Sequence, residues 1–158
     1  MSTSKTDRRP LSPHLSVYKW QLHAITSILT RITGNALIVG VVLFVGWLVA
    51  AATSEASFQF VNGIISSWLG KLVLIGSLWA LWYHTLAGIR HLIWDHAVWL
   101  DMNKSRILGW AVVLGSFALT FLTTFFFTGA FFDTTFFVAV FFVVFFELFV
   151  AFFTAIVC

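Results

Sequence analysis

The stretch from Leu72 to Ile89 contains no charged residue but includes one histidine, His84. A run of about 18 apolar residues is long enough to cross ~30 Å of hydrocarbon, because each residue of an α-helix adds about 1.5 Å. An ionisable side chain at that depth is costly and usually has a functional partner. The stretch therefore predicts a membrane-spanning helix that carries a buried imidazole.

Two interpretations of His84 follow from its chemistry. It can be a core histidine that donates a hydrogen bond to a carbonyl of a neighbouring helix, or an axial ligand of a haem iron, for which neutral imidazole is well suited. The other histidines lie outside the predicted spans or at their edge: His14, His23, His91 and His96. If an iron takes two histidines, the second must therefore come from another chain.

Helical periodicity places His84, Gly88, His91 and Asp95 on one stripe of this helix. The stripe combines an imidazole, a gap in the side-chain wall and an ionisable pair at the membrane edge. Arg90 lies off the stripe, so its side chain must reach round the helix or serve another surface.

The composition is that of an integral membrane protein, since 60% of the residues are hydrophobic and only 9% are charged. So little extramembrane mass leaves no room for a soluble active site. The single cysteine, Cys158, excludes an intrachain disulfide. The net charge of +3 requires no nucleic acid partner, because membrane topology explains it.

We expect an all-α membrane bundle with three core transmembrane helices and a fourth, C-terminal helix. The spans are predicted at about 25–52, 71–94 and 107–129, after an inner-side segment 1–24, with Asn103 or Ser105 capping the third span. Between the first two spans, apolar residues at helical spacing predict a short amphipathic helix on the outer surface: Phe58, Val61, Ile65 and Trp68. A plain loop is the alternative there.

The basic residues indicate how the chain crosses the membrane. Of the nine Lys and Arg residues, only Lys71 falls on the side opposite the amino terminus and the second loop. Because cytoplasmic loops carry the excess of Lys and Arg, the amino terminus is predicted to lie in the cytoplasm or the mitochondrial matrix.

The Phe-rich segment 130–158 allows two interpretations. It is long enough for a fourth span, with Asp133 near its outer end and Glu147 buried inside it. The alternative is an extension that is foreign to the rest of the fold, because its double phenylalanines recur with a spacing that matches neither a helix face nor a strand.

Ser27, Arg31 and Gly34 share one face at the start of the first span. Arg31 is either an interfacial arginine that reaches the lipid headgroups or a ligand-binding residue. We further expect Arg31, His91 and Asp95 to form one polar cluster at the inner face, because a lone charge at the edge of hydrocarbon loses solvation that a partner or water must replace. The alternative is that Asp95 is a solvated residue at the start of the loop.

Three motifs together resemble one family: RPLSPHL at 9–15, SILTRITG at 27–34 and HTLAGIRHLIWD at 84–95. In this order they are similar to the cytochrome b membrane-anchor subunit of succinate dehydrogenase (succinate:quinone oxidoreductase, respiratory complex II). The likeness covers roughly residues 9 to 115, and the last third of the chain is not covered.

The resemblance implies roles for particular residues. His84 would be the axial ligand of a haem b iron, with His91 and Arg31 near the haem propionates, and Ser27 and Arg31 would line the ubiquinone site. Supporting positions would be Thr30, Gly88, Arg90 and Asp95. Thr30 departs from the family, which usually has a histidine directly before the arginine, and this puts proton delivery or propionate binding in doubt.

The resemblance also implies the setting. The chain has no flavin fingerprint and no cysteine cluster for iron–sulfur centres, so it cannot oxidise succinate alone. It would anchor a flavoprotein subunit and an iron–sulfur subunit in a bacterial or mitochondrial inner membrane, sharing haem b with a second anchor subunit and contacting membrane lipids. A haem-free anchor and a fumarate reductase anchor are the alternatives.

Overall fold

The computed structural model of the chain describes residues 18–128, with side chains described as far as residue 125. The motif at 9–15 and the segment 130–158, with its predicted fourth helix and Glu147, lie outside the described residues.

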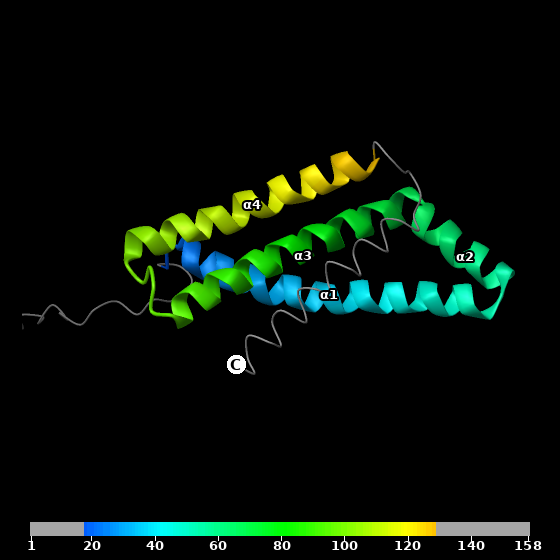
Figure 1. Cartoon of the computed structure of the whole chain (residues 1–158), viewed down its shortest axis with the longest axis horizontal. Helices are drawn as coiled ribbons and strands as arrows, with labels where there is room; N and C mark the ends of the chain where they lie inside the picture. Colours follow the sequence, from blue (N-terminus) through cyan, green and yellow to red (C-terminus); the bar gives the residue numbers. More distant parts are fainter. Residues whose placement is uncertain (1–17, 129–158) are drawn as a thin grey trace, which may run out of the picture.

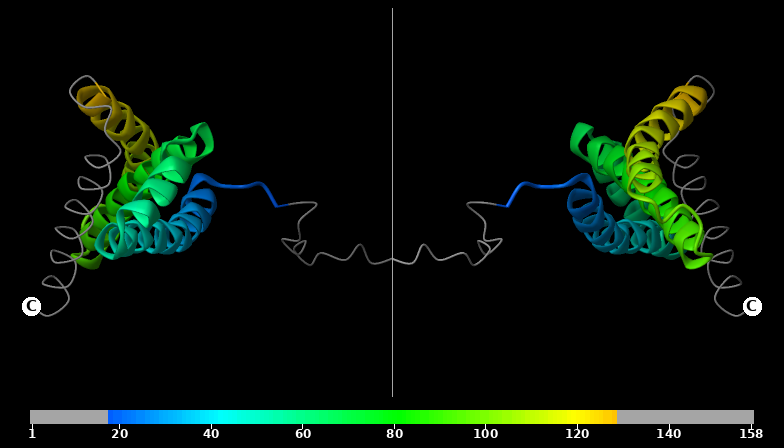
Figure 2. Two further views of the ribbon diagram at one scale, coloured as in Figure 1. Left: turned by 90° about the vertical axis from the view of Figure 1, so that its right-hand side faces the viewer. Right: turned by 90° about the vertical axis from the view of Figure 1, so that its left-hand side faces the viewer.

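Four helices make up the described part: α1 (Leu22–Thr53), α2 (Glu55–Ser66), α3 (Trp68–Asp95) and α4 (Met102–Thr128). The long helix α3 runs between α1 and α4 and contacts both, while α2 connects α1 to α3 at one end (Figure 1). Views along the bundle show α1 and α4 on different sides of α3 (Figure 2). The prediction of an all-α bundle is confirmed.

Three of these helices, α1, α3 and α4, are long and apolar enough to cross a membrane. The chain is therefore a multi-pass membrane protein. Each helix begins a few residues before the predicted span, and α4 begins at Met102, not near residue 107. The carbonyl of Asp101 accepts the first helical hydrogen bond of α4, from the Ser105 N–H (2.9 Å), so neither predicted cap residue caps this helix.

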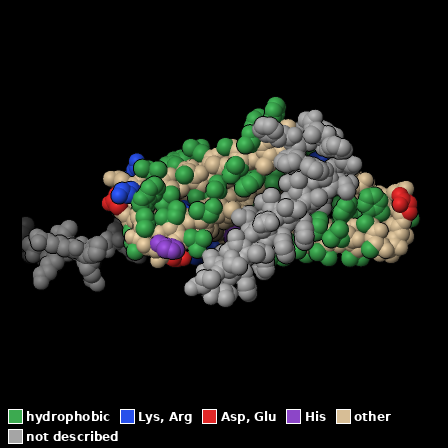
Figure 3. All heavy atoms as spheres, viewed as in Figure 1, with side chains coloured by type: hydrophobic (Ala, Val, Ile, Leu, Met, Phe, Trp, Pro, Cys, Tyr) green, Lys and Arg blue, Asp and Glu red, His purple; other side chains and the backbone are tan. Residues whose placement is uncertain are grey.

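The two ends of the bundle differ in charge. At one end, here called the basic end, α1 begins, α3 ends and α4 begins, and Lys19, Lys104 and Arg106 lie in these segments. The opposite end, called the α2 end, includes Glu55 and Lys71. Charged side chains gather mainly at the ends, and hydrophobic ones cover much of the length between them (Figure 3).

The helix α2 forms where the sequence predicts an amphipathic helix. The side chain of Ser54 caps it by accepting a hydrogen bond from the Ser57 N–H (3.2 Å). Its apolar face packs against α1, with Ile65 and Trp47 buried together and the Phe58 ring centroid 5.7 Å from that of Trp47. Trp68 was predicted to belong to this face, but it begins α3 and is 74% exposed.

A second apolar core holds the three long helices together. Tyr83 and Ala87 of α3 are completely buried, and they pack with Val112 of α4 and Leu29 of α1. This core fixes the face of α3 that looks toward α1, and it thereby positions His84 next to the first turns of α1.

Candidate functional site

The His84 side chain is half-buried between α3 and α1. Its Nδ1 lies 3.1 Å from the backbone carbonyl oxygen of Thr30 and 3.5 Å from Thr33 Oγ1. A carbonyl oxygen can only accept, so Nδ1 carries the proton and donates. In the neutral ring, Nε2 then has a free lone pair, which is the arrangement that second-shell hydrogen bonds impose on metal-binding histidines.

The surroundings of His84 are crowded on one side and open on the other. A Cβ atom at Gly34 would lie 3.0 Å from His84 Cε1, so a glycine at this position lets α1 approach the ring closely. A Cβ atom at Gly88, one turn along α3, would meet no heavy atom within 4 Å. The open stripe beside Gly88 therefore leaves room for a planar group next to the imidazole.

Thr30 contributes through its backbone. Its hydroxyl donates to the Thr26 carbonyl (2.8 Å), a contact within α1, while its own carbonyl accepts from His84. Any residue at this position would supply that carbonyl, so the absence of the family's histidine does not affect the orientation of His84. The Thr30 hydroxyl proton is used inside the helix, which makes it a poor donor to a ligand.

Ser27 and Arg31 are both exposed on the isolated chain, one turn apart on α1. Helical geometry places them about 60° round the helix axis from Thr30 and Gly34, respectively. They thus flank the face that contacts His84. Within the described residues, Arg31 forms neither a hydrogen bond nor an ion pair, so its guanidinium is available to a ligand or to another subunit.

The predicted cluster of Arg31, His91 and Asp95 does not form within the described chain. All three side chains are exposed, and Asp95 interacts electrostatically with His91, but Arg31 pairs with neither of them. The physical reason is the level along the bundle: Thr30, the neighbour of Arg31, contacts His84, whereas His91 and Asp95 lie about two and three turns further along α3.

Arg90 serves the surface of α3 that faces α1, on the same side of the helix as Tyr83. It is only 2% exposed, its Nη1 donates to Thr26 Oγ1 (3.0 Å), and its Cζ lies 4.8 Å from the centroid of the Trp94 ring. The sequence did not single out Thr26 and Tyr83, which contribute to this contact, nor Thr33 and Gly34 as neighbours of His84. The spacing of Thr26, Thr30 and Thr33 along one helix face was the available signal.

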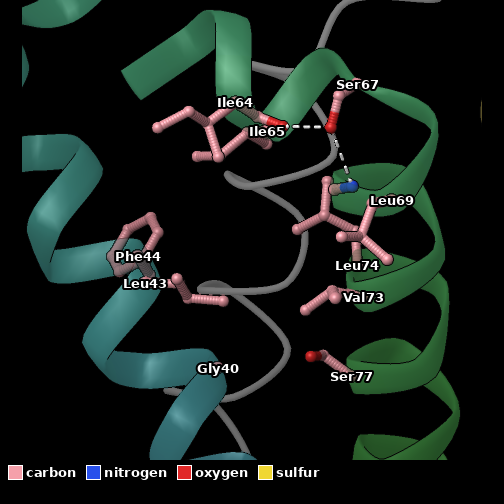
Figure 4. A pocket seen from close by; sticks show the side chains of 11 residues that line it. Gly40, Leu43, Phe44, Ile64, Ile65, Ser67, Leu69, Val73, Leu74 and Ser77 are labelled. Atoms are coloured by element: carbon pink, nitrogen blue, oxygen red, sulfur yellow. Dashed lines mark hydrogen bonds between the residues drawn. The ribbon is translucent and has the colours of Figure 1, made fainter. Parts of the chain in front are cut away.

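A cavity of about 180 Å³ lies at the α2 end, between α1, α2 and the start of α3 (Figure 4). Apolar side chains form most of its wall, and its hydroxyls belong to Ser67 and Ser77. The Ser67 hydroxyl is already used, because it donates to the Ile64 carbonyl (2.6 Å) and accepts from the Gly70 N–H (3.1 Å). This cavity suits hydrocarbon and does not include Ser27, Arg31 or His84.

Comparison with known proteins gives consistent matches. The sequence model of the family described as "Succinate dehydrogenase/Fumarate reductase transmembrane subunit" matches residues 5–123. The succinate dehydrogenase cytochrome b556 subunit of Paracoccus denitrificans is 50% identical over 123 residues, which cover 78% of this chain and 95% of the relative. The Rickettsia felis protein of that name is 40% identical over 116 residues (73% and 90%), and the mitochondrial cytochrome b560 subunit of Bos taurus is 38% identical over 118 residues (72% and 68%).

Proposed function

The chain belongs to the succinate dehydrogenase/fumarate reductase transmembrane subunit family, and we propose that it is the cytochrome b anchor of a succinate:ubiquinone oxidoreductase. The observation that carries the proposal is the state of His84, whose Nδ1 is held by the Thr30 carbonyl while the stripe beside Gly88 is open. The names of the relatives favour succinate dehydrogenase over a fumarate reductase anchor.

The residues present fit a haem b. His84 would hold the iron through Nε2, and its hydrogen bond to α1 would keep the imidazole ring in a fixed orientation in both oxidation states of the haem. When bound, haem b supplies a one-electron carrier within the membrane. His91 and Arg31, both exposed at or near the basic end, would serve the propionates. A second anchor subunit would supply the opposite face of the site.

Ser27 and Arg31 would bind ubiquinone. The quinone oxygens require hydrogen-bond donors, and they require them more strongly as negative charge develops during reduction. A hydroxyl and a guanidinium, both exposed on one side of α1, supply such donors. Since these side chains point away from the chain's own core, the rest of the pocket would be built by the iron–sulfur subunit and the second anchor.

The distribution of charge supports an orientation. The basic end would face the cytoplasm or the mitochondrial matrix, where the iron–sulfur and flavoprotein subunits would dock, and α2 would lie on the opposite surface. Electrons that arrive from the iron–sulfur subunit would then meet ubiquinone at the inner face of the membrane.

The test is the His84→Leu variant of the purified complex. We expect the b-type absorption of the reduced-minus-oxidised spectrum to be lost or strongly disturbed while the anchor still inserts. His96→Leu is the matched control, because His96 is exposed at the end of α3 and its imidazole bonds, within the described residues, only to the Leu92 carbonyl of its own helix (2.8 Å). An unchanged haem content in the His84 variant would contradict the assignment and favour a haem-free anchor.

A further inference from the structure

Three buried polar side chains join α3 to α1 close to the basic end. Thr26 and Tyr83 are 0% exposed and Arg90 is 2% exposed. The Tyr83 hydroxyl donates to the Thr26 carbonyl (3.1 Å), and Arg90 Nη1 donates to the Thr26 hydroxyl (3.0 Å). Both contacts converge on one residue of α1, and we call this group the Thr26–Tyr83–Arg90 cluster.

The charge in this cluster is unusual for its surroundings. No carboxylate among the described residues pairs with Arg90, and its buried Nε has no hydrogen-bond partner there. A buried guanidinium without an opposite charge costs desolvation energy that one hydroxyl contact and one aromatic ring only partly offset. Apolar packing would hold two helices together at lower cost, so helix association alone does not account for this residue.

The position of the cluster indicates a role for the buried Arg90 despite its desolvation energy. Thr26 directly precedes Ser27 and lies a little more than one turn before Arg31, so contacts to Thr26 fix the turn of α1 that presents both side chains. Tyr83 directly precedes His84 on α3. The same few residues of α1 and α3 therefore hold the quinone-binding positions and the imidazole in one relative geometry.

Hydrogen bonds are suited to this task because they are directional. The Thr26 carbonyl accepts from Tyr83 and from the Thr30 hydroxyl, while the Thr26 hydroxyl accepts from Arg90 and itself donates to the His23 carbonyl (3.1 Å). Apolar contacts between spans tolerate rotation and sliding, whereas these bonds specify both the rotation and the depth of α1.

We propose that Tyr83 and Arg90 are positioning residues for quinone reduction, which act through Thr26 to set the place of Ser27 and Arg31 relative to His84. The inference rests on the proposed function of Ser27, Arg31 and His84. It adds that a cluster of side chains at most 2% exposed, separate from the residues assigned to quinone and haem, determines how well the quinone site is assembled.

The first experiment measures geometry and is independent of activity. Nitroxide labels on cysteines at Ile25 and Ile89 report the α1–α3 distance near the cluster, and labels at Val45 and Ile75 report it near the α2 end; all four native side chains are exposed. In the assembled complex, with Cys158→Ser as background, Thr26→Val and Tyr83→Phe should shift or broaden the first distance distribution only. Unchanged distributions in both variants would overturn the proposal.

The second experiment separates positioning from general structural support. Thr26→Val and Arg90→Gln should raise the KM for a soluble ubiquinone analogue roughly tenfold, as expected for the loss of a charge-assisted hydrogen bond. Haem content and succinate oxidation with an artificial acceptor should remain. Thr26→Ser is the matched control: it keeps the hydroxyl, and the KM should stay at the value of the unmodified protein. Thr120→Val removes a buried hydroxyl that bonds only within α4, to the Ser116 carbonyl, and should change nothing.

The outcomes distinguish this inference from the function on which it rests. If Ser27→Ala and Arg31→Leu raise the quinone KM but the cluster variants do not, the positioning role is overturned and the quinone site stands. If none of these variants changes the quinone KM, the proposed quinone site fails, and the positioning role fails with it. An equal loss of artificial-acceptor activity in the cluster variants would reduce the cluster to a stabilising contact and would also overturn the role.

Discussion

At the scale of single residues, the backbone carbonyl of Thr30 determines which ring nitrogen of His84 carries the proton. From the sequence, a core histidine bonded to a neighbouring carbonyl and a haem ligand were separate interpretations. The geometry makes them compatible, because the hydrogen bond occupies Nδ1 and leaves Nε2 free. One imidazole can thus be tied to α1 and still offer a lone pair to a metal.

The donors of Ser27 and Arg31 lead to a prediction about quinone reduction. Ser27→Ala and Arg31→Leu should lower succinate–ubiquinone activity roughly tenfold or more, because each removes a donor to a quinone oxygen that gains charge during reduction. Steady-state assays with a ubiquinone analogue measure this loss. Succinate oxidation with an artificial acceptor that takes electrons upstream should survive, so an equal loss in both assays would mean that these residues only hold the complex together.

The sequence predicted His84 and its stripe, because an ionisable residue in an apolar run is visible without a structure. It did not predict that Arg90 would be buried against Thr26, nor that Arg31 would have no contact with Asp95. The second outcome depends on the level at which α1 and α3 meet, because Thr30, next to Arg31, contacts His84 and Asp95 lies about three turns further on. The first depends on how far α3 is rotated about its axis. Apolar residues surround this helix on all sides, so no periodic pattern sets that rotation.

At the scale of elements, the helices were more predictable than their ends. Length and apolar composition sufficed for α1, α3 and α4, and period 3.6 sufficed for α2. The boundaries depend on single caps, as the assignment of Trp68 illustrates. The side chain of Ser67 caps α3 by accepting a hydrogen bond from the Gly70 N–H. Trp68 is therefore the first residue of α3 and does not extend the apolar face of α2.

The packing of α2 leads to an element-scale prediction that compares two adjacent isoleucines. Ile65 is 8% exposed and packs against Trp47, whereas Ile64 is 55% exposed. Ile65→Ala should lower the free energy of unfolding by about 2 kcal/mol, because it leaves a gap beneath the helix. Ile64→Ala should have little effect. Denaturant titration of the purified chain in detergent, followed by tryptophan fluorescence, measures both, and equal effects would contradict this docking of α2.

At the scale of the whole molecule, the two ends differ in their side chains and in the contacts between their helices. The basic end brings together the turns that carry Ser27, Arg31 and His91, while the α2 end has an amphipathic helix and a cavity lined mostly by apolar side chains. The contacts that tie α1 to α3 also differ along the bundle. Hydrogen bonds from Tyr83, His84 and Arg90 are made toward the basic end, and apolar packing around Trp47 is found at the α2 end.

The orientation of the whole molecule gives the last prediction, which tests where these two ends lie in the membrane. Ala56 lies in the first turn of α2 and Asn103 in the first turn of α4, and both are exposed and lie at opposite ends of the bundle. In a Cys158→Ser background expressed in a bacterium, a cysteine at Ala56 should react with a membrane-impermeant maleimide in cells whose inner membrane is intact. A cysteine at Asn103 should react only after that membrane is permeabilised, because the excess of Lys and Arg at this end predicts that it lies in the cytoplasm. The reverse pattern would place Ser27, Arg31 and the proposed quinone site on the outer face, where an iron–sulfur subunit in the cytoplasm has no access to them.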